Sequence, residues 1–190
     1  TWEVDSGEIL ASQEVHDISV ALGIDPGSDD LANLRYHKIC ILADADSDGL
    51  HIASLLCALF LRHFRPLVKA GNIFVAMPPL YRIDQGKKVH YALDEYEKDA
   101  ILKRLNDSSV KAKPNVQRFK GLGEMNPSQL RETTMDPGKR TLLQVMIPDG
   151  ADPAAVKDTA KRVESLMGRK PELRFAFIQE HARFVSDLDV

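Results

Sequence analysis

Residues 37–77 contain the pattern that most constrains the fold: two short apolar segments separated by a longer amphipathic one. "HKICILAD" (37–44) and "NIFVAM" (72–77) are short, apolar and rich in β-branched residues, as buried strands are. Between them, "LHIASLLCALFLRHFRPLV" (50–68) spaces its apolar residues as one face of a helix, with Pro66 expected to end it. Strand, helix and strand predict a βαβ unit and therefore an α/β fold with a parallel sheet and flanking helices.

A different pattern begins near residue 78. "PLYRIDQGKKVHYAL" (79–93) predicts a hairpin, and "DEYEKDAILKRLND" (94–107) predicts an amphipathic helix with acids first and bases last. Shorter segments alternate after that, with strands expected at 115–125 and 139–147 and helices at 126–135, 152–167 and 171–185. We therefore expect two domains, 1–78 and a smaller α+β tail at 79–190, with a helix at 12–22 preceding the first strand.

Composition narrows the class of protein. The 190 residues are 44% hydrophobic and 28% charged, which is typical of a globular protein. The net charge of −3 argues against a uniformly basic nucleic-acid binder, although a local basic patch remains compatible with it. No apolar run approaches the ~18 residues of a membrane span, so no membrane partner is expected. Cys40 and Cys57 lie in apolar runs and are expected to be reduced thiols in the core of a cytosolic protein.

Three aspartates follow the first predicted strand at every second position: Asp44, Asp46 and Asp48. Alternate side chains of a strand share a face, so Asp44 and Asp46 are expected to point the same way at the carboxyl end of the sheet, where ligands bind in such folds. Asp48 is expected in the turn at the helix start, where its carboxylate can cap free N–H groups. Like charges this close favour a cation between them.

Three interpretations of this cluster compete. The spacing matches the first half of an EF-hand calcium loop, but position 12 of that loop requires a glutamate and here is Leu55. A capped turn with two solvated acids is the structural alternative. The third is a Mg²⁺ site, since Mg²⁺ takes one or two carboxylates and completes its shell with water and phosphate oxygens.

Two long motifs carry a family resemblance. "ILADADSDGLHI" (41–52) and "QRFKGLGEMNPSQLRETTMDP" (117–137) resemble the B subunits of bacterial type IIA DNA topoisomerases. "SQEVHDISVALGID" (12–25) and "MPPLYRI" (77–83) are closer to the topoisomerase IV branch than to gyrase. Phe119 points the same way, because gyrases usually carry tyrosine there. The B subunit of gyrase remains the alternative within this family.

The resemblance implies a Mg²⁺-dependent module for DNA cleavage and religation. Residues 1–78 are expected to be the C-terminal portion of a Toprim domain, with Asp44 and Asp46 as the catalytic metal ligands and Asp48 as the third acid. The family's Toprim glutamate is expected to precede Thr1, so the chain alone is expected to be inactive. ATP is expected to be a cofactor of the full-length protein only.

The resemblance also implies partners. The family acts on double-stranded DNA with a tyrosine of the A subunit, in an A2B2 heterotetramer in the bacterial cytoplasm and nucleoid. The four tyrosines of this chain are therefore not expected to be nucleophiles. The tail is expected to contact the Toprim core or the A subunit. A chain that only docks on DNA or on the A subunit, with an idle metal site, is the alternative from another functional class.

Three further residues are candidates for DNA contact. His51 follows the acids and can contact a phosphate or a water, and Arg118 and Lys120 flank the "GLG" turn at 121–123, where they can form part of a cationic rim for DNA phosphate. The alternative for each is a solvated surface side chain. The two glycines are expected to allow a tight turn or close packing rather than to form a phosphate loop, since the lysine and serine or threonine of such a loop are missing.

Overall fold

The computed structural model describes residues 2–107, 112–147 and 153–184. The helices are α1 (Gln13–Leu22), α2 (Ser47–His63), α3 (Arg65–Lys69), α4 (Glu95–Asn106), α5 (Pro127–Leu130), α6 (Pro153–Met167) and α7 (Pro171–His181). The strands are β1 (Ile39–Ile41), β2 (Ile73–Met77), β3 (Tyr81–Gln85), β4 (Lys88–Ala92), β5 (Asn115–Arg118) and β6 (Thr141–Gln144). Short 3-10 turns lie at Glu8–Ala11, Leu122–Glu124 and Ala182–Phe184, and a π-helical turn lies at Arg131–Met135.

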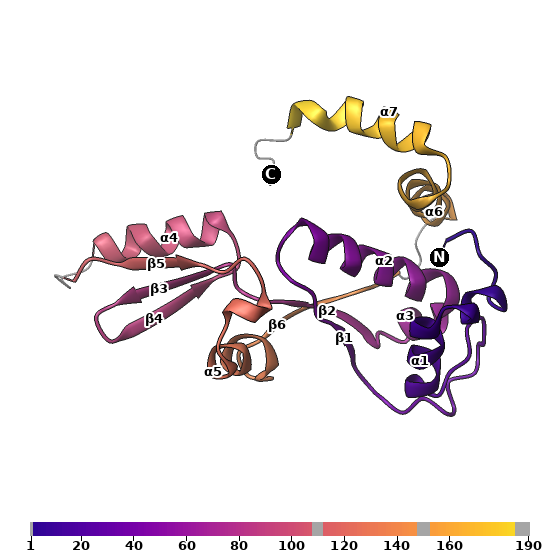
Figure 1. Ribbon diagram of the computed structural model, residues 1–190, viewed down its shortest axis with the longest axis horizontal. Helices are drawn as coiled ribbons and strands as arrows, with labels where there is room; N and C mark the ends of the chain where they lie inside the picture. Colours follow the sequence, from indigo (N-terminus) through magenta and orange to yellow (C-terminus); the bar gives the residue numbers. More distant parts are fainter. Residues whose placement is uncertain (1, 108–111, 148–152, 185–190) are drawn as a thin grey trace. The chain divides into compact units, whose positions relative to one another are not determined.

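The described strands form two small sheets, in the orders β1-β2-β6 and β4-β3-β5 (Figure 1). The second sheet is antiparallel throughout, with Ile83 of the central strand opposite both His90 and Val116. In the sequence, helices alternate with the strands of both sheets. This mixture of helices and strands confirms a mixed α and β structure, while the parallel sheet expected from the sequence stays a prediction.

The chain divides into two compact units. The first unit comprises Thr1–Ile39, Ser54–Phe74 and Gln144–Val190, and the second comprises Cys40–Ala53 and Val75–Leu143. Both units are discontinuous along the chain, because the segment 40–53 belongs with the strands and turns that follow residue 75. This division by contacts does not test the expected domain boundary at residue 78, which stays a prediction.

The core of the first unit surrounds α1, the end of α2 and α3. Gly23 ends α1 in the left-handed conformation (φ 75°), which a residue with a side chain rarely adopts. The rings of Phe60 and Phe64 pack with their centroids 5.7 Å apart. His63 is 1% exposed, and its Nδ1 lies 3.3 Å from Ser6 Oγ.

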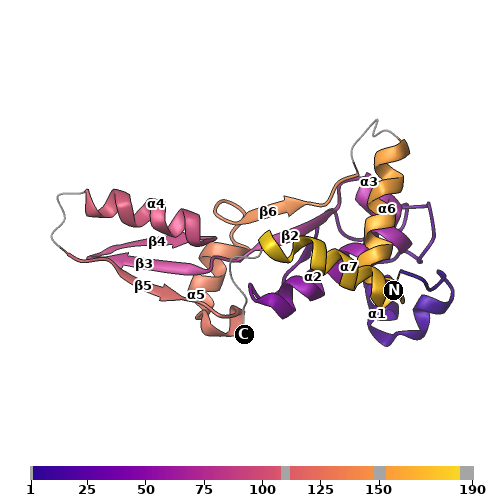
Figure 2. The same ribbon diagram turned by 90° about the horizontal axis from the view of Figure 1, so that it is seen from above.

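The core of the second unit lies where α4 covers β3 (Figure 2). Its buried side chains are Tyr81, Ile83, Ala92, Ile101 and Leu105. The predicted hairpin and helix are both confirmed: β3 and β4 are joined at Gly86-Lys87, and α4 starts at an Asp94 cap whose carboxylate accepts the Glu97 N–H at 2.8 Å.

Three details of the sequence prediction are wrong. The first strand is only Ile39–Ile41, and Cys40 within it is exposed rather than buried. The segment 50–68 is not one helix: α2 ends at His63, and Pro66 lies in the first turn of the separate helix α3 (Arg65–Lys69), as its fixed φ allows. The apolar face predicted for α2 is buried only in its second half, since Ile52 is 53% exposed whereas Leu59 is 3% exposed.

The later elements agree with the sequence. Asn126 and Gln129 form a capping box at the start of α5, with Pro127 in the first turn. The first residue of the helix predicted at 152–167, Asp152, lies outside the described residues. Among residues 2–107, 112–147 and 153–184, no helix combines the length and the apolar character that crossing a membrane requires.

Candidate functional site

Asp44 lies against the "GLG" turn of the second motif. Its Oδ1 accepts a hydrogen bond from the backbone N–H of Leu122 at 2.7 Å, across 78 residues of sequence. Both residues belong to the second unit, so the contact lies within one compact body. The two motifs that carry the family resemblance therefore meet at this carboxylate.

Gly121 makes this approach possible. A Cβ at this position would lie 3.0 Å from Asp44 Oδ1, 3.1 Å from Cγ and 3.3 Å from Oδ2, so the glycine leaves the space that the carboxylate occupies. Its φ of −164° is extended backbone, and the requirement is therefore steric. The prediction of close packing is confirmed for Gly121, whereas a Cβ on Gly123 would meet nothing within 4 Å.

Buried neighbours and hydrogen bonds anchor this turn at both ends. Phe119, which is 2% exposed, donates its N–H to the Leu80 carbonyl at 2.8 Å, and Met125 is 7% exposed at the other side of the turn. The Glu124 carboxylate accepts the Lys120 N–H at 2.8 Å. The Leu122 N–H is thus presented to Asp44 by a turn whose two ends are held in place.

Asp46, not Asp48, caps the following helix. The structure starts α2 at Ser47, and Asp46 Oδ1 accepts the Gly49 N–H at 2.7 Å while its carbonyl accepts the Leu50 N–H at 3.0 Å. These are the bonds of an N-cap residue. Asp48 lies exposed in the first turn of α2. The capping role predicted for Asp48 is therefore wrong.

The geometry assumed for the acids also differs from the prediction. β1 ends at Ile41, so Asp44 and Asp46 lie beyond the strand and do not share a strand face. Their positions come from two different contacts, one with the turn at residues 121–122 and one with the start of α2. Gly49 packs closely on the backbone of Asp44, since a Cβ on Gly49 would lie 2.0 Å from the Asp44 carbonyl oxygen.

The acids suit Mg²⁺ in their chemistry but do not form a complete site. Carboxylate oxygens are the ligands that Mg²⁺ prefers, and one or two suffice when water and phosphate complete the shell. Across the part of the chain that the structure describes, no three His, Cys, Asp or Glu side chains converge as a metal site. Asp44 and Asp46 each use Oδ1 for a backbone N–H, and these bonds hold the carboxylates in fixed positions.

The three candidate DNA contacts are all exposed and all belong to the second unit. His51 lies in the second turn of α2, and Lys120 lies directly before Gly121. Arg118 ends β5 opposite Tyr81, close enough to Glu95 to contribute to the lowered pKa of that carboxyl, after the larger effects of Lys98 and Tyr81. Of these three residues, Lys120 is therefore the one adjacent to the Asp44 contact.

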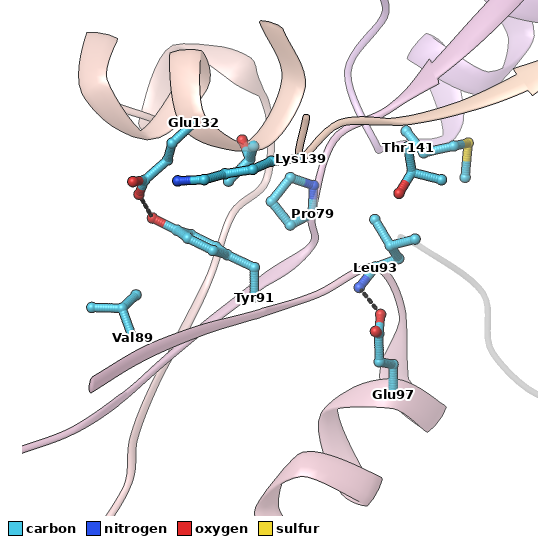
Figure 3. A pocket seen from close by; sticks show the side chains of 10 residues that line it. Pro79, Val89, Tyr91, Leu93, Glu97, Glu132, Lys139 and Thr141 are labelled. Atoms are coloured by element: carbon cyan, nitrogen blue, oxygen red, sulfur yellow. Dashed lines mark hydrogen bonds between the residues drawn. The ribbon is translucent and has the colours of Figure 1, made fainter. Parts of the chain in front are cut away.

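A pocket that the sequence did not reveal lies beside β4 (Figure 3). Its volume is about 480 Å³, and its lining is Met77, Pro79, Val89, Tyr91, Leu93, Glu97, Glu132, Thr133, Lys139 and Thr141. The Tyr91 hydroxyl donates to Glu132 Oε1 at 2.5 Å, and Glu97 Oε2 accepts the Leu93 N–H at 2.7 Å. Burial, and then the Glu132 carboxylate, raise the pKa of Tyr91 to about 12.

Little in the sequence points to the contact between Tyr91 and Glu132. Glu132 lies in the π-helical turn Arg131–Met135, a distortion that is often found at functional positions. The alternation of β4 indicates that Tyr91 shares a face with Val89, but nothing in the sequence indicates that residues 91 and 132 meet, 41 positions apart. Only the tertiary structure reveals this contact.

Comparison with known proteins agrees with the motifs. The family described as "DNA gyrase B subunit, carboxyl terminus" matches residues 111–179. The B subunit of DNA topoisomerase 4 from Pseudomonas aeruginosa is 69% identical over 158 residues, which are 83% of this chain. The corresponding protein of Salmonella typhimurium is 63% identical over 191 residues, covering 100% of the chain. The chain belongs to the B subunits of bacterial type IIA DNA topoisomerases.

Within this family the chain is more similar to these two topoisomerase IV proteins than to a gyrase protein. The B subunit of DNA gyrase from Halalkalibacterium halodurans is 50% identical over 184 residues, below the 69% and 63% of the two topoisomerase IV proteins. The chain spans 25% and 29% of the length of those two relatives. It therefore corresponds to about a quarter of a type IIA B subunit.

Proposed function

We propose that this chain is the part of a topoisomerase IV B subunit that holds Mg²⁺ and positions a DNA phosphate for cleavage and religation. The observation that supports this most is the contact of Asp44 with Leu122, which joins the acidic motif to the "RFKGLGEM" motif in one compact unit. Residues 1–78 then belong to a Toprim domain, and residues 79–190 form a tail that contacts that domain or the A subunit.

The acids and the bases have separate roles in this proposal. Asp44 and Asp46 are the ligands, with Asp48 near them at the helix start. The Leu122 N–H and the start of α2 each fix one carboxylate before any ligand arrives, which reduces the ordering that binding requires. When bound, Mg²⁺ supplies positive charge for the phosphate and the departing oxygen. His51, Arg118 and Lys120 contact the DNA backbone from the same unit.

The remaining parts of the reaction come from outside this chain. The A subunit supplies the tyrosine nucleophile in an A2B2 complex on double-stranded DNA, and a glutamate outside this chain completes the metal site. ATP is bound elsewhere in the full-length protein. The complex works in the bacterial cytoplasm, at the nucleoid.

The experiment is Asp46→Asn in the full-length protein, assembled with its A subunit. Asparagine keeps the cap of α2 but removes the negative charge, so folding is retained while Mg²⁺ is held less well. We expect DNA cleavage at millimolar Mg²⁺ to fall by at least tenfold and to recover partly as Mg²⁺ is raised. Unchanged cleavage would overturn the metal role. Negative supercoiling of relaxed DNA, in place of decatenation, would assign the chain to gyrase.

A docking module with an idle metal site is the second candidate. It is favoured by one observation: no three potential ligands converge among the described residues. Mn²⁺, which binds hard oxygen ligands as Mg²⁺ does, distinguishes the two in the full-length protein. Loss of the free Mn²⁺ resonance with wild type but not with Asp44→Asn supports the metal module. If wild type and Asp44→Asn give the same Mn²⁺ resonance, the docking module alone is supported.

A further inference from the structure

One end of the second unit's antiparallel sheet carries a group of cationic side chains. They come from the β3–β4 turn, the last turn of α4 and the segment before β5, and all are exposed: Lys87, Lys88, Lys103, Arg104 and Lys113. We call these five residues the basic pole. They lie at the opposite end of the β4-β3-β5 sheet from the "GLG" turn, where the β3–β4 turn and the end of α4 come together in both views (Figures 1 and 2).

A buried glutamine holds these three segments together. Gln85, at the end of β3, is 4% exposed, and its Nε2 donates to the Leu105 carbonyl at 3.4 Å and to the Ala112 carbonyl at 3.0 Å. Leu105 follows the two cations of α4, and Ala112 precedes Lys113. Gln85 itself pairs with Lys88 across the hairpin. The cations of the basic pole are therefore gathered by one buried side chain.

The charges of the basic pole are not neutralised within the fold. Over the described ranges 2–107, 112–147 and 153–184, none of the five takes part in an ion pair. Two cations elsewhere on the same sheet and helix are paired, Arg82 with Asp84 at 3.0 Å and Lys98 with Glu95, whereas Arg118 at the end of β5 takes part in no ion pair among the described residues. The acids of α4, Glu95, Glu97 and Asp99, lie in its first half, and the exposed C-cap residue Asp107 forms no ion pair with these cations among the described residues.

Helix stability alone does not account for this arrangement. The macrodipole favours bases in the last turn of a helix, which explains Lys103 and Arg104. It does not explain Lys87 and Lys88 in the hairpin or Lys113 before β5, because these residues are not helical. Five like charges at one end of a sheet repel one another and create a positive potential that attracts an anionic partner.

The length of β3 sets the distance between the basic pole and the Arg118 end of the sheet, beside the "GLG" turn. β3 runs from Tyr81, which pairs with Arg118 beside the "GLG" turn, to Gln85. Four steps of about 3.3 Å separate these ends by roughly 13 Å. One strand of a duplex advances about 3.4 Å per phosphate, so for a duplex lying along β3 about four phosphates would separate the basic pole from the Arg118 end.

We propose that the basic pole is a second contact surface for the phosphate backbone of duplex DNA, separate from the acidic motif and the "GLG" turn. This inference rests on the proposed function, because it requires DNA to lie against the second unit. Unpaired, exposed lysine and arginine side chains suit sequence-independent phosphate contacts. The basic pole therefore contributes to affinity and not to the cleavage chemistry.

The test is the salt dependence of DNA binding by the full-length protein assembled with its A subunit, without Mg²⁺ and with a duplex of about four helical turns as probe. The test variant is Lys87→Ala, Lys88→Ala and Lys113→Ala combined, which leaves α4 intact. The control removes the same charge from α6, by Lys157→Ala, Lys161→Ala and Arg162→Ala, all exposed. Each lost phosphate contact lowers the slope of log K against log salt by about one.

We expect the test variant to bind at least tenfold more weakly near 0.1 M salt, with a slope smaller by about two to three, and the control to bind as wild type does. An unchanged affinity and slope overturns the proposal. If DNA binding is unchanged while association with the A subunit weakens, the basic pole faces an acidic protein surface instead, and the proposal is wrong.

Failure of the inference about the basic pole can be distinguished from failure of the proposed function. Cleavage by Asp46→Asn reports the metal role, whereas this assay contains no Mg²⁺ and measures only binding. If the wild-type complex does not bind the duplex at all, the proposed function fails. If it binds and the test variant binds equally well, only the inference about the basic pole fails.

Discussion

The Asp44 carboxylate and the Leu122 N–H lie 2.7 Å apart, with Gly121 leaving room for the approach. This contact connects two motifs that are 78 residues apart in sequence. It gives "GLG" a physical purpose: the first glycine admits the carboxylate, and the following N–H orients it. Substitutions at this contact and at its neighbours should therefore have separable effects on stability.

Gly121→Ala should disturb the Asp44 carboxylate. The new Cβ would meet Oδ1 at 3.0 Å, so the side chain must shift, and we expect the free energy of unfolding to fall by about 1 kcal/mol. Urea denaturation of the chain measures this. Gly123→Ala, with nothing within 4 Å of its Cβ, is the matched control and should change stability by less than about 0.5 kcal/mol. An equal loss in an Asp44→Ala background would show that the clash is not with Asp44.

Asp46→Ala should destabilise the start of α2, whereas Asp46→Asn should not. The Gly49 N–H loses its acceptor in the alanine variant, at a cost of about 1 kcal/mol. Asparagine presents an oxygen in the same place and should keep more than half of that stability. Thermal unfolding of the two variants beside wild type gives the comparison. Similar losses in both would mean that the charge of Asp46 matters more than its hydrogen bond.

Tyr91 should ionise far above the ordinary range. Because the pKa of Tyr91 is raised from 10.0 to about 12 in the fold, the neutral phenol is the favoured form there. The resulting stability is complete below about pH 10 and is lost as the pH rises towards 12. Tyrosinate absorbance of wild type and Tyr91→Phe isolates this group. Glu132→Gln should lower the pKa of Tyr91 partly, and a Tyr91 transition near pH 10 in wild type would contradict the contact.

Gln85→Leu should loosen the basic pole. Leucine fills similar space but leaves the carbonyls of Leu105 and Ala112 without this donor, at a cost of about 1–3 kcal/mol. Urea denaturation measures the loss, and hydrogen exchange should become faster in the last turn of α4. Gln117→Leu, on the exposed strand β5, serves as control and should be close to neutral. Equal stability of both variants would show that Gln85 does not join the three segments.

Much of the local structure is predictable because its causes are local. Asn126-Pro127 with Gln129, Asp94 before α4, and Gly23 after α1 are signals that act over three or four residues, and the structure shows each of them at the end of its helix. The β3–β4 hairpin belongs to the same class, since its turn and its alternation are adjacent in sequence. The first strand is shorter than its apolar run predicts, because such a run does not determine where hydrogen-bonded pairing stops.

The sequence by itself was enough to identify the acidic cluster, the family motifs and most helix and strand positions of this protein. Only the tertiary structure decided that Asp46 rather than Asp48 caps α2, that Asp44 meets Leu122, that Tyr91 meets Glu132, and that Gln85 gathers the basic pole. The physical reason is distance along the chain. Propensities and caps act between neighbouring residues, whereas the direction of a carboxylate depends on which N–H the folded chain brings beside it.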